Sequence, residues 1–132
     1  PFESEQGRDF NNQNNGSLVF RLLYGARSFY FSGDLEVEGE EKLVASRLNL
    51  RADFLKSGHH GSRTSDTVQF LERVQPKFAA ISCGVDNQFH HPHPITIEHF
   101  QERGIAIFRT DLDVIIEAVS DGDFLRVNGW GK

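Results

Sequence analysis

Two apolar segments that each end in glycine and a metal-binding side chain constrain this 132-residue chain most. Residues 53–62, Asp-Phe-Leu-Lys-Ser-Gly-His-His-Gly-Ser, have the pattern of a short buried strand followed by a turn that carries two histidines between glycines. Residues 28–34 follow the same pattern and end in Gly33 and Asp34. Strand ends are rigid and the loops beyond them are open, so α/β proteins build sites there. Asp and His suit Zn²⁺, Mn²⁺ or Fe.

The remaining pattern predicts one domain with the element order β-β-α-β-α-β-α-β-β-β. Strands are expected at residues 17–24, 27–32, 53–57, 77–83, 105–109, 114–119 and 124–127. Helices are expected at residues 35–48, from Thr64 or Ser65 to about Val74, and at residues 95–103. Residues 77–83 are apolar almost throughout, so this strand should be buried on both faces. The predicted fold class is α/β, layered, with mixed strand directions.

Charge and composition exclude some classes of function. The net charge of -5 argues against a chain that binds nucleic acid through its overall field, although a bound metal can supply positive charge locally. No run approaches the roughly 18 apolar residues of a membrane helix, so no membrane segment is predicted. The single cysteine, Cys83, excludes an intrachain disulfide and lies in an apolar run, where we expect a buried thiol.

Asp34 allows two interpretations. An Asp that precedes a helix is commonly an N-cap, whose side chain accepts a backbone N–H. The capping-box pattern is absent, because position 37 is Val rather than Glu or Gln. Gly33 indicates that the backbone approaches another group closely, which favours a functional role for Asp34.

The histidines also leave alternatives open. His59 and His60 could be solvated loop residues, or one could bind a metal while the other faces the substrate or transfers a proton. The sequence does not decide which does which. His91 and His93 lie in a loop stiffened by prolines, where they could form a substrate-facing wall or cap the next helix. His99, within a predicted helix, is expected at the surface or its boundary.

Three segments together resemble the C-terminal half of the metallo-β-lactamase fold. They are Phe-Ser-Gly-Asp-Leu at 31–35, Leu-Lys-Ser-Gly-His-His-Gly-Ser at 55–62, and Gly-Val-Asp-Asn-Gln-Phe-His-His-Pro-His-Pro at 84–94. The most similar branch is the hydrolase domain of ComEC-type competence proteins, which act in DNA uptake, and their free-standing relatives. The resemblance covers about residues 11–120.

The resemblance implies half of a four-layer αββα sandwich with a mixed sheet and up to two Zn²⁺ ions in the intact site, with Mn²⁺ or Fe as alternatives. The metal ligands would be Asp34 and one of His59 and His60, and the catalytic histidines would come from His59, His91 and His93. The implied activity is a metal-dependent hydrolase of phosphodiesters, with DNA as a candidate substrate. The alternatives are an esterase of small molecules or of phosphorylcholine, and a non-catalytic structural or interaction module.

The sequence departs from the family in one large respect, because the metal motif His-x-His-x-Asp-His is absent. Two ligands are too few, since a catalytic zinc normally has three protein ligands and an open position. We therefore interpret residues 1–132 as the C-terminal portion of one domain, inactive alone, whose partner is the missing N-terminal half or a second chain. The chain begins with Pro1 and contains no Met, so we expect either a processed chain or a piece of a longer protein. An isolated half should expose apolar sheet and self-associate as a homo-oligomer. The resemblance implies a bacterial protein, either cytoplasmic or an extracytoplasmic domain of a membrane uptake protein.

Overall fold

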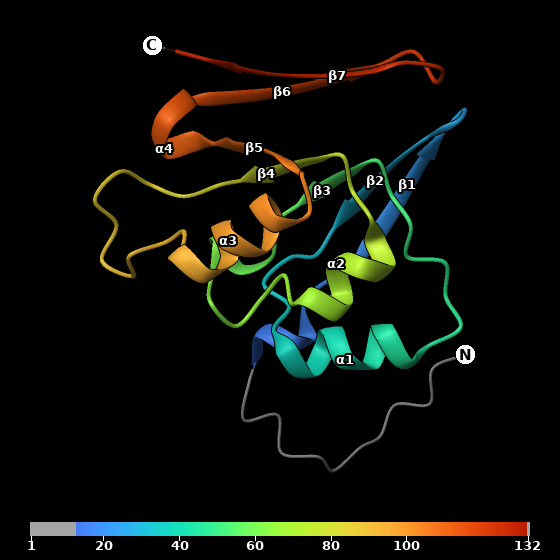
Figure 1. Cartoon of the computed structure of the whole chain (residues 1–132), viewed down its shortest axis with the longest axis horizontal. Coiled ribbons are helices and arrows are strands. Elements are labelled where there is room, and N and C mark those ends of the chain that lie inside the picture. Colours follow the sequence, from blue (N-terminus) through green and yellow to red (C-terminus); the bar gives the residue numbers. More distant parts are fainter. Residues whose placement is uncertain (1–12, 132) are drawn as a thin grey trace.

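The computed structural model describes residues 13–131 and has an α/β architecture with a mixed sheet (Figure 1). The sheet has five strands in the order β1-β2-β3-β4-β5. Their bounds are β1 (Phe20–Tyr24), β2 (Arg27–Phe31), β3 (Phe54–Lys56), β4 (Phe78–Ile81) and β5 (Ala106–Arg109). The first two strands pair antiparallel and the remaining pairs are parallel, which confirms the predicted mixture of strand directions.

Three helices connect the parallel strands and cover one face of the sheet (Figure 1). Their bounds are α1 (Val37–Ala45), α2 (Val68–Val74) and α3 (Pro94–Glu102). α2 begins after Thr67, whose side chain accepts the N–H of Phe70 at 3.4 Å, so the predicted cap at Thr64 or Ser65 is wrong. The reason is tertiary: the Ser65 hydroxyl donates to the carbonyl of Leu35 at 2.6 Å, and this contact holds the preceding residues in a loop.

A two-stranded hairpin lies on the opposite face of the sheet (Figure 1). The short helix α4 (Thr110–Asp113) leads from β5 into β6 (Ile115–Ser120), which pairs antiparallel with β7 (Leu125–Trp130). The predicted order of the main strands and helices is therefore confirmed. Residues 13–131 form three layers, consisting of helices, sheet and hairpin. They confirm the α/β class, but they do not confirm the four-layer sandwich of which half was expected.

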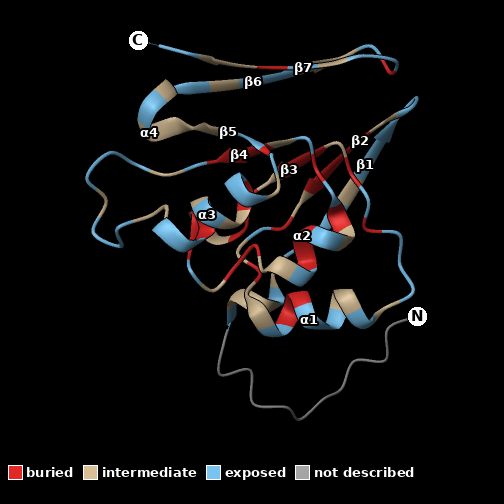
Figure 2. Ribbon diagram, in the orientation of Figure 1, coloured by how far each residue is buried: buried red, intermediate tan, exposed pale blue. Residues whose placement is uncertain are grey.

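Alternation along the strands divides the core between the two faces of the sheet. Leu55 is fully buried under the helices with Phe70, whereas its neighbour Phe54 packs toward the hairpin with Val127. β4 alternates in the same way and is buried on both faces, as predicted. Figure 2 shows this buried band through the middle of the sheet.

The first strand and parts of the hairpin are exposed although they are apolar (Figure 2). The large exposed side chains of β1 are Phe20, Leu22, Leu23 and Tyr24, with exposed fractions of 46% to 61%. In the hairpin, Ile115 and Trp130 are more than half exposed. Single exposed apolar residues are ordinary, but a run of four along an edge strand is typical of a surface that another element covers.

Within residues 13–131, no helix has both the length and the apolar character needed to cross a membrane. Residues 1–12 lie outside the part of the chain that the structure describes. Gln13–Gly16 form a short 3-10 helix.

Candidate metal centre

The carboxyl ends of three parallel strands meet at one edge of the sheet. The register pairs Phe31 of β2 with Lys56 of β3, and Lys56 with Ala80 of β4. Asp34 follows β2, and the short 3-10 helix η2 (Gly58–Gly61), which we call the histidine turn, follows β3. The loop that carries His91 and His93 follows β4. The sequence segments expected to carry chemistry therefore lie together in space.

Asp34 presents its side chain at this edge and does not cap α1. The residue that precedes α1 is Glu36, and it makes no side-chain capping bond. The backbone N–H of Asp34 donates to the hydroxyl of Ser17 at 3.0 Å. Gly33 has φ +57, and a Cβ there would lie 2.8 Å from the Cβ of Ser17, so this turn needs glycine. The capping interpretation of Asp34 is thus rejected, and its half-exposed carboxylate is available to a ligand.

His60 faces Asp34 with a defined ring nitrogen. Its Nδ1 lies 2.7 Å from the carbonyl oxygen of Ser82, and because a carbonyl only accepts, Nδ1 carries the proton. In the neutral ring, Nε2 then holds the lone pair, and it lies 3.7 Å from Oδ1 of Asp34. A metal-binding histidine is usually oriented in this manner, with the other nitrogen on a carbonyl or carboxylate. Of the two adjacent histidines, the geometry favours His60 as the ligand.

His59 occupies a different environment from its neighbour. Its Nδ1 lies 2.8 Å from Oε1 of Glu36, an ion-pair contact without the alignment of a hydrogen bond. Its ring centroid is 5.6 Å from that of His91 and 6.3 Å from that of His60. His59 therefore lies beside the pair of Asp34 and His60. Its ring is also next to that of His91, so proton transfer between the two rings is feasible.

The loop after β4 packs on the histidine turn through His91 and its neighbours. The Asn87 side chain donates to the carbonyl of His91 at 2.6 Å and accepts its N–H at 2.9 Å, which fixes the loop. Burial, and then the neighbouring histidines, lower the pKa of His91 below its usual value, so its ring is neutral near pH 7. Phe89 stacks on this ring with a centroid separation of 5.8 Å.

His93 has a structural role that the sequence had left open. Its Nδ1 accepts the N–H of Ile95 at 3.3 Å, so it caps α3. Its own N–H donates to the carbonyl of Gly61 at 2.8 Å and joins the loop to the turn. The helix-capping alternative therefore describes this residue.

The residues at this edge of the sheet supply only part of the ligand set that a metal centre needs. Within the described part of the chain, no group of three or more His, Cys, Asp or Glu side chains is arranged to hold a metal ion. Asp34 and His60 form a pair with the donor types that zinc prefers, but a catalytic zinc normally has three protein ligands. The pair can therefore supply part of a metal centre and not the whole of one.

Two buried carboxylates behind the turn were missed by the sequence analysis. Glu40 on α1 and Asp66 before α2 both have no exposed surface. Burial, and then the nearby charge of Glu40, raise the pKa of Asp66 to about 7. Burial also raises the pKa of Glu40. The position of Glu40 along the helix was the one signal for its burial. Unlike the other acids of residues 35–48, Glu40 lies on the face of α1 that packs inward.

Lys56 was likewise passed over, although it ends the strand that leads into the histidine turn. Its ammonium donates to the carbonyl of Ser57 at 2.9 Å. Burial lowers the pKa of this ammonium, while the charges of Asp66 and Asp34 act in the opposite direction. A positive charge thus lies within electrostatic range of Asp34.

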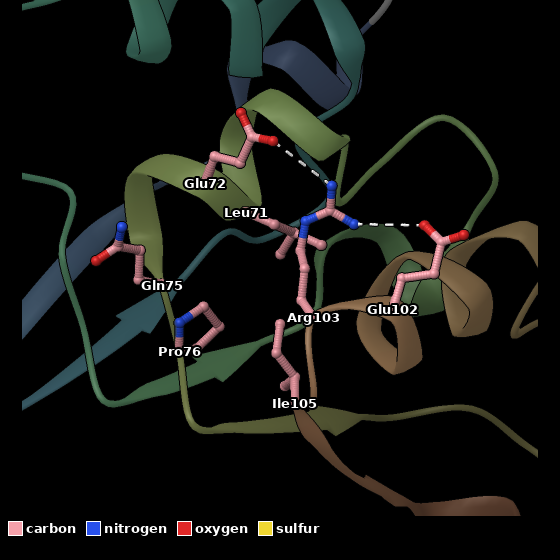
Figure 3. Close-up of a pocket in the computed structure, with 7 residues that line it drawn as sticks. All are labelled: Leu71, Glu72, Gln75, Pro76, Glu102, Arg103 and Ile105. Atoms are coloured by element: carbon pink, nitrogen blue, oxygen red, sulfur yellow. Dashed lines mark ion pairs between the residues drawn. The ribbon is translucent and has the colours of Figure 1, made fainter.

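A pocket of about 510 Å³ lies away from this edge, between α2 and α3 (Figure 3). Arg103 lies within it, 3.7 Å from a carboxylate oxygen of Glu72 and 3.8 Å from one of Glu102. The other residues that line it are Leu71, Gln75, Pro76 and Ile105. None of these residues belongs to the histidine turn or to the loop after β4, so the pocket and the candidate metal centre are separate.

The chain is similar to segments of three longer bacterial proteins. It is 40% identical over 114 residues to ComE operon protein 3 of Bacillus subtilis, which covers 86% of this chain and 15% of that protein. It is 39% identical over 100 residues to competence protein ComA of Neisseria gonorrhoeae, covering 75% of this chain and 14% of the relative. Recombination protein 2 of Haemophilus influenzae is 33% identical over 97 residues, covering 74% of this chain and 12% of the relative.

These similarities do not reach most of the relatives' length, since the chain spans between 12% and 15% of each of the three. No protein-family model matches the chain.

Proposed function

The relatives support a competence-related family for this chain, and on that premise we propose that it forms one side of a metal-dependent hydrolase that cleaves phosphodiesters, with DNA as substrate. The observation that carries the proposal is the pairing of Asp34 with His60. The Ser82 carbonyl holds the His60 ring by Nδ1, and Nε2 lies 3.7 Å from the Asp34 carboxylate. A histidine that binds a metal is usually held in this way, by a hydrogen bond from the ring nitrogen that does not face the metal.

In this proposal Asp34 and His60 hold a metal, which we take to be Zn²⁺, with Mn²⁺ or Fe as alternatives. A bound metal of this kind supplies a nucleophilic hydroxide near neutral pH and stabilises negative charge on phosphoryl oxygens. His60 keeps Nε2 directed toward Asp34 because Ser82 holds the opposite nitrogen.

The neighbouring histidines supply proton transfer in this proposal. Glu36 faces Nδ1 of His59 and leaves Nε2 as the nitrogen that exchanges a proton with the leaving group. His91, whose pKa is lowered by burial, is neutral near pH 7 and can accept a proton. His93 contributes by position, since its cap on α3 and its bond to Gly61 hold the loop against the turn.

The remaining ligands come from outside this chain in our proposal. They are supplied by an N-terminal half of the same domain, or by a second chain, that also covers the exposed side chains of β1 and the hairpin. Two observations support this partner. The described residues bring together two suitable ligands rather than three, and the apolar edge strand is exposed. The chain alone is therefore expected to be inactive.

A non-catalytic interaction module is the competing function, and the incomplete ligand set favours it. The deciding experiment measures hydrolysis of bis(p-nitrophenyl) phosphate and of single-stranded DNA by the intact protein with Zn²⁺ or Mn²⁺. We expect turnover that falls about a hundredfold or more in Asp34→Ala and in His60→Ala. Asp123→Ala, in the exposed hairpin turn, is the matched control and should retain activity. Undetectable turnover would favour the non-catalytic alternative, and equal turnover in Asp34→Ala would refute the proposed role of Asp34.

A further inference from the structure

The histidine turn has a backbone conformation that its residues do not favour. His59 has φ 41 and His60 has φ 57, so two consecutive non-glycine residues lie in the left-handed region. Such residues persist only where the surrounding structure determines them, and they are frequent at functional sites. The direction of the His60 ring therefore depends on whatever holds the two ends of the turn.

Asp66 holds the start of the turn. Its carboxylate accepts the hydroxyl of Ser57 at 2.5 Å and the backbone N–H of Gly58 at 3.3 Å. Gly58 packs so closely here that a Cβ would lie 3.1 Å from the Cβ of Ser65. Ser57 and Gly58, at the entrance to the turn, are therefore each held by one hydrogen bond to the same buried side chain.

Glu40 in turn holds Asp66. One oxygen of its carboxylate accepts the N–H of Asp66 at 2.6 Å and the other accepts the N–H of Thr67 at 2.8 Å. Asp66 itself has φ 54, a conformation that these contacts stabilise. A continuous set of hydrogen bonds thus runs from α1, through Glu40 and Asp66, to the first residues of the turn.

Core packing alone would not select two carboxylates at these positions. Both side chains are completely buried, and buried charges destabilise a fold unless their partners compensate for the lost hydration. Burial raises the pKa of both carboxyls, which is the signature of that loss of hydration. Apolar residues of similar volume would leave the backbone N–H groups of Gly58 and Asp66 without an acceptor, so the two acids serve the backbone of the turn rather than the packing of the core.

We propose that Glu40 and Asp66 are positioning residues, which hold Ser57 and Gly58 so that the His60 ring stays on the Ser82 carbonyl with Nε2 directed at Asp34. The inference rests on the proposed function in one respect only, namely that His60 is a metal ligand. Asp66 is not a catalytic residue in this scheme, since it does not reach the ligand pair.

The test is nuclear magnetic resonance of the His60 ring in the 132-residue chain, compared among four proteins. In the wild type, the nitrogen-15 shifts of the His60 ring should report a proton on Nδ1, because this atom donates to the Ser82 carbonyl. Asp66→Ala removes both hydrogen bonds and should abolish that signal. Asp66→Asn should restore it, because an amide can accept from Gly58, donate to Ser57 and tolerate the positive φ. Val74→Ala, in the core of α2, is the control for general destabilisation and should retain the signal.

A second variant covers the case in which Asp66→Ala does not fold. Ser57→Ala removes one of the two bonds and should shift the His60 ring resonances while the chain remains folded. Zinc titration of the intact protein with the same substitutions gives a second readout, in which the dissociation constant should rise about ten- to hundredfold for Asp66→Ala and stay near that of the wild type for Asp66→Asn.

The inference is overturned if folded Asp66→Ala and Ser57→Ala both keep the wild-type His60 signals, or if Val74→Ala loses them equally. A failure of the proposed function would give a different set of results. In that case the intact wild-type protein binds no zinc and shows no hydrolysis, while the ring signals still report whether Asp66 positions the turn.

Discussion

Replacing Asp66 by Asn should raise the free energy of unfolding above about pH 7 and leave it nearly unchanged below about pH 4. Burial and the charge of Glu40 raise the pKa of the Asp66 carboxyl from 3.8 to about 7. A carboxyl with a raised pKa binds its proton more tightly in the folded state. Its stabilising contribution is therefore complete below the unfolded pKa and is lost as the pH rises through about 7.

The magnitude follows from the size of that change in pKa. Each pKa unit corresponds to about 1.4 kcal/mol, so the wild type should lose up to about 4 kcal/mol between pH 4 and pH 8 through this group. Asn at position 66 carries no charge and can keep both hydrogen bonds, so the variant should lack this component of the pH dependence. The variant should exceed the wild type by up to about 4 kcal/mol at pH 8, a large fraction of the stability of a small domain.

The assay is urea unfolding followed by circular dichroism, repeated at steps of pH from 4 to 8 for both proteins. Asp123→Asn provides the control for the same chemical change at an acid that lies in an exposed turn. The reasoning would be refuted by parallel profiles for wild type and Asp66→Asn, or by a variant that is less stable at pH 8.

Three further predictions follow from particular contacts. Gly61→Ala should lower the stability by about 1–3 kcal/mol in thermal unfolding, because φ is +78 and the new Cβ would lie 2.7 Å from the Cβ of Pro92. Gly104→Ala, with φ +64 and open space, should cost only about 1 kcal/mol, and an equal effect at both sites would contradict the steric argument. Phe70→Ala should cost about 3–5 kcal/mol in chemical denaturation, since this ring is fully buried, and a loss under about 1 kcal/mol would argue against the core as described. Burial and a neighbouring carboxylate raise the pKa of the Cys83 thiol to about 11, so iodoacetamide should label the folded chain slowly at pH 7 and the unfolded chain much faster; rapid labelling of the folded chain would disprove this.

The sequence alone determined the order and type of the main elements, because the signals for these are local. Alternation, apolar runs and turn residues predicted the helices and strands in their observed order. The two-sided burial of β4 followed from its continuous apolar character. The meeting of Asp34 with the histidine turn also followed, since parallel strands deliver their carboxyl ends to one edge.

The tertiary structure decided the questions that depend on residues far apart in the chain. His60 rather than His59 faces Asp34 because a carbonyl 22 positions further along holds its ring. Asp66 is fixed by Glu40, 26 positions earlier, and this contact has no local pattern in either segment. His93 caps α3 in a loop that is held against the distant turn by the bond from its N–H to the carbonyl of Gly61. Side-chain direction is set by hydrogen bonds across the fold, and hydrophobic periodicity carries no information about them.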